Sequence, residues 1–325
     1  MLIRRAYLGM QCWLVMTMGM SVADANDYPA RPVRFVVAQP PGGGTDVVAR
    51  MLAQHMSEVL KQQVVVDNRP GAGGIVGTEL VSKARPDGYT LLLGYTGSLT
   101  INPALHKKLP YHPVRDFDPV SLAVASPLVL TVHPSVKAGS FGDLIALARA
   151  RAGTPLNYAS PGNGSLHHLS IEWIKSAMGV ELVHVPYKGA ASFNSVVAGQ
   201  TQLGFVSLVS GLPQVKAGRA RALAVTSKTR SPMLPEVPAL AEVGLPEFDA
   251  RNWFGVLVPK GTPKSTIDTL SSVIMEYMRM PQTKARVLEG GSEAIGSTPA
   301  EFSELIRREG ERWAKVVQQA GMAVD

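Results

Sequence analysis

The chain has 325 residues and a formal net charge of +7; 46% of its residues are hydrophobic and 18% are charged. This composition excludes a largely disordered chain, and the length suits two α/β domains or one large one. The basic residues are scattered rather than gathered into a patch with interleaved aromatic residues, which argues against a nucleic-acid partner. The positive charge suits an anionic ligand or an ordinary solvated surface equally well.

The N-terminal segment has the three parts of a secretory signal peptide. Arg4 and Arg5 precede an apolar stretch over 6–20, and small residues follow at 23–25. We predict a signal peptide over 1–25, cleaved before Asn26, and export to the periplasm. The alternative, a membrane anchor, needs about 20 apolar residues, more than this stretch provides. Cleavage removes two positive charges and one negative charge, so the net charge falls from +7 to +6.

The single cysteine, Cys12, lies inside this apolar stretch. Its neighbours Gln11 and Trp13 are not the small residues expected around a lipid-attachment cysteine. We therefore expect no lipoprotein. A mature chain without cysteine forms neither a disulfide nor a thiolate metal site.

A strand, a glycine-rich loop and a helix follow one another repeatedly along the mature chain. The predicted strands and their loops lie over 33–38 and 39–44, 64–66 and 69–74, 90–93 and 94–98, and 156–159 and 160–165. Apolar residues at helical spacing follow the loops, most clearly after the first and the fourth. Alternating strands and helices predict an α/β fold with a parallel sheet covered by helices on both faces.

The rest of the chain contains further predicted strands and helices. The strands lie over 128–132, 183–185, 203–206, 223–226 and 253–259, and one helix lies over 190–197. Proline and glycine are frequent over 231–246, which predicts a connection along the surface. Two terminal helices are predicted to start at Pro263 and Pro299, the second after a capping box formed by Thr298 and Glu301.

The glycine loops predict the binding chemistry. A loop between a strand and a helix leaves backbone N–H groups free at the positive end of the helix dipole, which favours an anion. In an open α/β sheet such loops gather at the carboxyl ends of the strands, where ligands bind. One such loop is more often a simple turn than a site, but four in one chain strengthen the prediction.

No complete catalytic motif accompanies these loops. The chain lacks a phosphate-binding G-x-x-x-x-G-K-[ST] loop, a dinucleotide G-x-G-x-x-G motif and a G-x-S-x-G nucleophile turn. Ser165 with His167 and His168 leaves an exported hydrolase open as an alternative. His168 and Glu172 offer two metal ligands, which is too few for a zinc site. We predict no enzyme activity, no cofactor and no metal.

Several motifs occur in an order that resembles one known family. They are PGGGTD at 41–46, NRPGAGG at 68–74, YASPGNGS at 158–165, VPYKG at 185–189 and RARALAVT at 219–226. Together with the segment 254–263, they resemble the Bug family, the periplasmic receptors of tripartite tricarboxylate transporters that are abundant in Bordetella and related bacteria. The resemblance covers essentially the whole mature chain.

The resemblance implies a type II periplasmic-binding-protein fold, in which two lobes enclose a ligand cleft. Lobe 1 would contain 26–125 and 251–325, and lobe 2 would contain 126–250. The implied function is capture of a di- or tricarboxylate, an aromatic acid or a similar small anion for inner-membrane transporter subunits. A ligand sensor that acts on a two-component kinase remains an alternative.

The resemblance also implies which residues hold the ligand, mainly through backbone amides and bridging waters. They are Gly43, Gly44, Thr45 and Asp46 on the first loop, Ser160, Asn163, Gly164, Ser165 and His167 on the mid-chain loop, and Tyr187, Lys188 and Gly189 as a lid. Many relatives carry an acidic residue where this chain has Val206. That difference leaves the identity of the carboxylate open and argues against transferring an amino-acid specificity.

Overall fold

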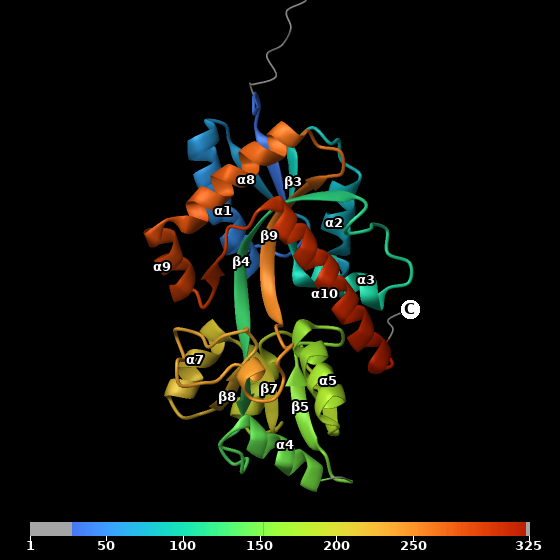
Figure 1. Cartoon of the computed structure of the whole chain (residues 1–325), viewed down its shortest axis with the longest axis vertical. Helices are drawn as coiled ribbons and strands as arrows, with labels where there is room; N and C mark the ends of the chain where they lie inside the picture. The colour runs from blue at the N-terminus through green and yellow to red at the C-terminus, as the bar shows by residue number, and fades with distance from the viewer. Residues whose placement is uncertain (1–27, 152, 323–325) are drawn as a thin grey trace, which may run out of the picture.

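The computed structural model describes residues 28–151 and 153–322 (Figure 1). The predicted signal peptide, its cleavage site and Cys12 lie outside these ranges. The strands are β1 (Val33–Val37), β2 (Val64–Asn68), β3 (Thr90–Tyr95), β4 (Phe117–Val132), β5 (Leu156–Ser160), β6 (Leu182–Pro186), β7 (Leu203–Ser207), β8 (Arg221–Val225), β9 (Arg251–Pro259) and β10 (Glu293–Ala294).

Helices separate most of these strands. They are α1 (Gly44–Leu60), α2 (Ile75–Ser82), α3 (Asn102–Leu105), α4 (Phe141–Ala150), α5 (Leu166–Met178), α6 (Ala191–Val197), α7 (Leu208–Lys216), α8 (Lys264–Arg279), α9 (Pro281–Glu289) and α10 (Pro299–Gln319), with short turns η1 (Ala72–Gly74), η2 (Gly97–Ile101) and η3 (Leu240–Glu242). None of the helices in the described ranges is long and apolar enough to cross a membrane.

The strands form one sheet with two halves that share β4. The order is β2-β1-β3-β9-β4-β7-β5-β6, with β10 and β8 also paired to β4. The first half contains β1, β2, β3, β9, β10 and the start of β4; the second contains β5 to β8 and the end of β4 (Figure 1). The predicted α/β fold is confirmed, with parallel pairing of β1 with β2 and β3, and of β5 with β6 and β7.

The centre of the sheet differs from the parallel arrangement predicted. Strand β4 runs antiparallel to β9, β7 and β8. The reason is the path of the chain: β4 leaves the first half for the second, and β9 returns. Only 128–132 of β4 was predicted, because Pro119 and Pro127 interrupt the strand pattern. A register shift between Pro119 and Ser121 accommodates the first of these prolines.

Helix α10 packs against both halves of the molecule. The side chains of Phe302 and Ile306 are buried with Trp253 of the first half. Those of Trp313 and Val316 are buried with residues of the second half. Figure 1 shows α10 running from the first half down beside α5. Its start is as predicted, since the Thr298 N–H donates to Glu301 at 2.8 Å and the Glu301 N–H to the Thr298 hydroxyl at 3.3 Å.

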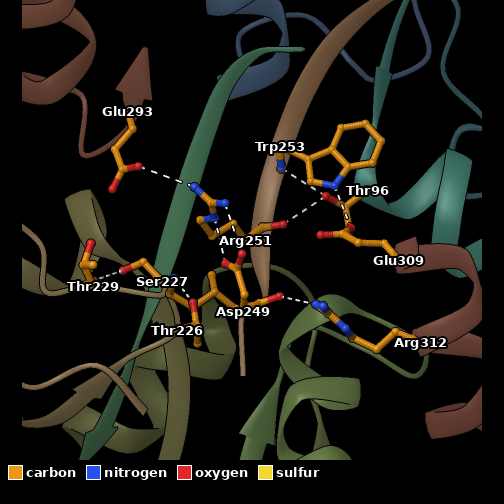
Figure 2. A network of polar contacts seen from close by, with 11 residues as sticks. Thr96, Thr226, Ser227, Thr229, Asp249, Arg251, Trp253, Glu293, Glu309 and Arg312 are labelled. Atoms are coloured by element: carbon orange, nitrogen blue, oxygen red, sulfur yellow. Dashed lines mark hydrogen bonds and ion pairs between the residues drawn. The ribbon is translucent and has the colours of Figure 1, made fainter. Parts of the chain in front are cut away.

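A buried carboxyl group of α10 lies where the chain passes between the halves (Figure 2). Glu309 is 3% exposed and accepts a hydrogen bond of 2.7 Å from Trp253 Nε1. One turn further along, Arg312 donates to the backbone oxygen of Asp249 at 2.5 Å. Burial raises the pKa of Glu309 to about 7, because a charged carboxylate is poorly solvated there.

We expect Glu309→Gln to stabilise the protein at pH 8 and to leave its stability nearly unchanged at pH 4.5. The pKa of Glu309 rises from 4.5 to about 7 on folding. The native state therefore holds the proton more tightly, and stability is lost as pH rises through this range. Glutamine keeps an acceptor for Trp253 without the buried charge, so the expected gain is about 3 kcal/mol.

Urea unfolding curves at the two pH values measure this difference. A Glu311→Gln variant, which changes an exposed carboxylate on the same helix, is the control. Equal destabilisation of Glu309→Gln at both pH values would contradict the expectation.

Candidate functional site

A cavity of about 480 Å³ lies between the two halves of the molecule. Its lining residues come from three regions: Ala72, Gly73, Ile75, Tyr95, Gly97, Ile101, Asn102, Leu105 and His106; Pro161, Gly162, Asn163, Gly164, Ser165, Leu166 and His167; and Asn252 of β9. Among the described residues, no lysine, arginine, aspartate or glutamate belongs to this lining. The lining therefore offers backbone groups and polar or apolar side chains other than lysine, arginine and carboxylates.

The loop between β5 and α5 forms one wall of the cavity. Gly162 and Gly164 have φ values of +142° and +72°, which glycine adopts more readily than other residues. A Cβ at Gly164 would also collide with the side chain of Leu105. Ser165 caps α5 by accepting a hydrogen bond from the His168 N–H at 3.2 Å. The glycines thus let the chain turn sharply and bring the start of α5 to the cavity.

Only some of the amides in this loop remain available to a ligand. The Gly162 N–H donates to the Ser160 hydroxyl at 3.1 Å, and the Gly164 N–H donates to His168 Nδ1 at 3.1 Å. The N–H groups of Asn163, Leu166 and His167 make no hydrogen bond to any described residue. Because the last two lie in the first turn of α5, they present free donors at the positive end of the helix dipole.

A buried group of aromatic and polar side chains supports the loop from behind. The rings of His168 and His184 stack with centroids 3.7 Å apart, and His184 Nε2 lies 2.7 Å from the hydroxyl oxygen of Ser160. Tyr158 donates to Glu172 at 2.5 Å, and Lys175 donates to the same carboxylate at 2.8 Å. These contacts fix the positions of Ser160 and His168, which in turn hold Gly162 and Gly164.

His167, His168 and His184 are neutral near pH 7. Burial, and then the neighbouring His184 ring, lower the pKa of His168 to about 4. Burial alone lowers the pKa of His167 to about 4, and it also lowers the pKa of His184. A neutral His168 can accept the Gly164 N–H at Nδ1, whereas a protonated imidazole has no free acceptor.

The opposite wall is built on the second glycine loop of the sequence. Ala72, Gly73 and Gly74 all have positive φ values, of 46°, 62° and 90°. The Gly73 carbonyl accepts hydrogen bonds from the Tyr95 hydroxyl at 2.5 Å and from Asn102 Nδ2 at 3.0 Å. The two side chains hold this left-handed turn against the cavity.

Some of the predicted ligand residues line the cavity, one lies behind it, and the others lie outside its lining. Asn163, Gly164, Ser165 and His167 line the cavity, and Ser160 is fully buried behind it. The first glycine loop, with Gly43, Gly44, Thr45 and Asp46, does not line it, nor do Tyr187, Lys188 and Gly189. Contact of these two groups with a ligand stays a prediction.

Asp46 has a structural role in the first loop. Its carboxylate accepts from the Gly42 N–H at 3.0 Å, from Arg50 at 2.9 Å and from Asn68 at 3.0 Å. The hydrogen bond from Arg50 is the main cause that holds the pKa of Asp46 below its ordinary value. The carboxylate therefore closes the loop at the start of α1.

The sequence analysis did not single out Tyr95, Asn102, Leu105, His106 or Asn252, all of which line the cavity. The third strand–loop unit placed Tyr95 at the carboxyl end of a strand, which was a usable signal for that residue. Asn252 gave none, because it lies near the start of β9, far away in the sequence from the glycine loops. Val206 is buried in an apolar cluster with Val129 and Phe193 and does not line the cavity.

Comparisons with known proteins identify similar transport receptors. Residues 48–322 match the model of the tripartite tricarboxylate transporter family receptor. The chain is 40% identical to the UPF0065 protein in the tcbD-tcbE intergenic region of Pseudomonas sp. strain P51, over 94% of this chain and 91% of that protein. It is 38% identical to protein BugT of Bordetella pertussis, over 92% of each.

A solved structure agrees with this family match. An R. palustris protein solved with adipate superimposes with a TM-score of 0.77 and 36% identity, covering 91% of this chain and 99% of that one.

We expect the stability of the protein to fall as pH is lowered from about 6.5 to about 4, and His168→Asn to reduce this fall. The pKa of His168 drops from 6.5 to about 4 on folding. The unfolded chain therefore binds its proton first, and stability is lost as pH falls through this range. For His168 alone the loss is about 3 kcal/mol.

Asparagine keeps an acceptor near the position of Nδ1 but does not titrate. Unfolding free energies at pH 7 and pH 4.5 test this, with His133→Asn as the control, because His133 is half-buried and its Nδ1 also accepts a backbone N–H, that of Ser135. If the unfolding free energy of His168→Asn falls between pH 7 and pH 4.5 by as much as that of the wild type, titration of His168 is not the cause of the loss.

Proposed function

This chain belongs to the tripartite tricarboxylate transporter receptor family, and we propose that it captures a small organic carboxylate in the cavity between its halves. The observation that carries this proposal is the set of free N–H groups at Asn163, Leu166 and His167. These three residues line a cavity to which no described residue contributes an acidic side chain, at the start of a 13-residue helix. A carboxylate there would accept several backbone hydrogen bonds and meet the positive end of the helix dipole.

The relatives support a carboxylate as the class of ligand. The R. palustris structure, 36% identical to this chain, was solved with adipate. The lining of the present cavity includes the apolar side chains of Ile101, Leu105 and Leu166 beside its polar groups. A carboxylate with a short hydrocarbon body satisfies both kinds of surface.

We propose that the two halves act as lobes, with 26–125 and 251–325 in lobe 1 and 126–250 in lobe 2. Strand β4 runs across the boundary at 125/126, and β9 begins at the boundary at 250/251, so a small bend in β4 and in the segment that leads into β9 would move one lobe against the other. A ligand favours the closed form only if it makes more contacts there. Closure that brings 43–46 and 187–189 toward the cavity would give these loops their predicted role.

The receptor delivers its ligand to the membrane components of the transporter and performs no chemistry on it. Among the described residues, the Ser165 hydroxyl makes one hydrogen bond, which it accepts from the backbone N–H of His168. No general base therefore contacts this hydroxyl group in the described part of the chain. A hydrolase would need an imidazole nitrogen at this oxygen. Nothing in the site favours signalling to a kinase.

We expect adipate to raise the melting temperature of the wild-type protein and to bind Gly164→Ala at least about tenfold more weakly. The substitution forces a side chain into a left-handed conformation and against Leu105, which displaces the loop amides. The matched control is Gly179→Ala at the other end of α5, where φ is +60° and a Cβ meets no atom within 4 Å.

Isothermal titration calorimetry and thermal unfolding of both variants make the comparison. The proposal fails if no member of a carboxylate series stabilises the wild type. The assignment of the loop fails if Gly164→Ala and Gly179→Ala bind adipate equally well.

We also propose that the chain is exported with a cleaved signal peptide over 1–25. The family consists of periplasmic receptors, and the N-terminus has the composition of such a peptide. Mass spectrometry of protein from the periplasmic fraction should show Asn26 as the first residue. A retained Met1 in that fraction would contradict the prediction.

A further inference from the structure

We infer that Asn252 is a second recognition point in the cavity, which selects ligands that carry a further polar group besides the carboxylate held by the α5 amides. The inference rests on the proposed function, since it assumes a carboxylate at the α5 amides. It adds a requirement that the amides alone do not impose. A ligand must carry two polar groups to use the whole cavity.

The side chain of Asn252 is polar and half-buried. It lines the cavity from β9, whereas the α5 amides line it from the other half of the molecule. Its carboxamide makes no hydrogen bond to any described residue. By contrast Asn102, the asparagine of the opposite wall, donates to Gly73. An unused carboxamide in a binding cavity can donate to a carboxylate or accept from a hydroxyl group.

The backbone around Asn252 is held from both sides by one buried hydroxyl group. The Oγ1 atom of Thr96 donates to the backbone oxygen of Arg251 at 3.1 Å and accepts from the Trp253 N–H at 3.0 Å (Figure 2). Thr96 is fully buried. The residue between these two bonds therefore has a fixed position, and its side chain is presented to the cavity without further adjustment.

The side chains next to Asn252 add to this rigidity. Arg251 binds Asp249 through two hydrogen bonds of 2.8 and 3.1 Å and lies 3.5 Å from Glu293 (Figure 2). Trp253 donates to the buried Glu309. None of the residues in these contacts belongs to the cavity lining, and their charged and polar groups bind one another. Asn252 is the member of this segment that stays free for a ligand.

The other polar side chains that line the cavity from the first half, those of Tyr95, Asn102 and His106, have interactions of their own, which leaves Asn252 as the unused polar group among the described residues of this wall. Ile75, Ile101, Leu105 and Leu166 are apolar, and no charged side chain among the described residues competes for the second polar group of the ligand. A second carboxylate or a hydroxyl would replace water at Asn252. A methyl end would remove that water and leave the carboxamide unpaired, which binding sites built on hydrogen bonds penalise strongly.

The test compares linear dicarboxylates, from succinate to suberate, with monocarboxylates of the same length, such as adipate with hexanoate. We expect Asn252→Ala to weaken the best dicarboxylate at least about tenfold and to change its monocarboxylate partner less than about twofold. Thr96→Val, which removes both backbone hydrogen bonds, should show the same selective loss. Asn163→Ala, in the α5 wall, is the control and should affect the two ligands by similar factors.

Urea unfolding of each variant at the titration temperature establishes that it is folded. The inference is overturned if Asn252→Ala weakens both members of a pair equally, if it weakens neither, or if the wild type binds both with equal affinity. In each of these cases the proposed carboxylate receptor still stands. A wild type that binds no member of either series overturns the proposed function and the inference together.

Discussion

The pairing of β4 with strands on both of its sides is the constraint on which the rest of the structure depends. Its first part pairs with β9, and its last part pairs with β7 and β8. Backbone hydrogen bonds fix the register of each pair, so the two halves cannot separate without breaking the sheet. The loops at the carboxyl ends of both sets of parallel strands therefore meet at one seam, where the cavity lies.

The described residues that line the cavity at that seam include no acidic side chain, lysine or arginine. Buried side chains behind the lining hold its loops in place. Neutral imidazoles, a serine hydroxyl and a tyrosine hold the loops, while the cavity is lined by residues whose amides and carboxamide make no hydrogen bond to any described residue. Buried polar networks of this kind stabilise one conformation only when every member is paired. A rigid arrangement of dipoles can bind an anion without the desolvation cost of a buried arginine or lysine.

Features that depend on a few neighbouring residues could be predicted from the sequence, whereas features that depend on distant residues could not. Gly164 and Thr298 were identifiable because a glycine turn and a capping box are encoded within a few residues. The length of β4 and the direction of β9 were not, since prolines interrupt the first and a partner distant in sequence determines the second. Asn252 was missed for the same reason: its position depends on Thr96, 156 residues earlier in the chain.

Helix α10 begins in the core of the first half and ends against the second, where the Ser176 hydroxyl donates to Gln319 at 3.2 Å. The described chain starts at Tyr28, which packs on Tyr89 in the first half. The two ends of the described part of the chain thus belong to different halves. Fluorescent labels attached near Tyr28 and Gln319 would report the distance between the halves directly, without any probe inside the cavity.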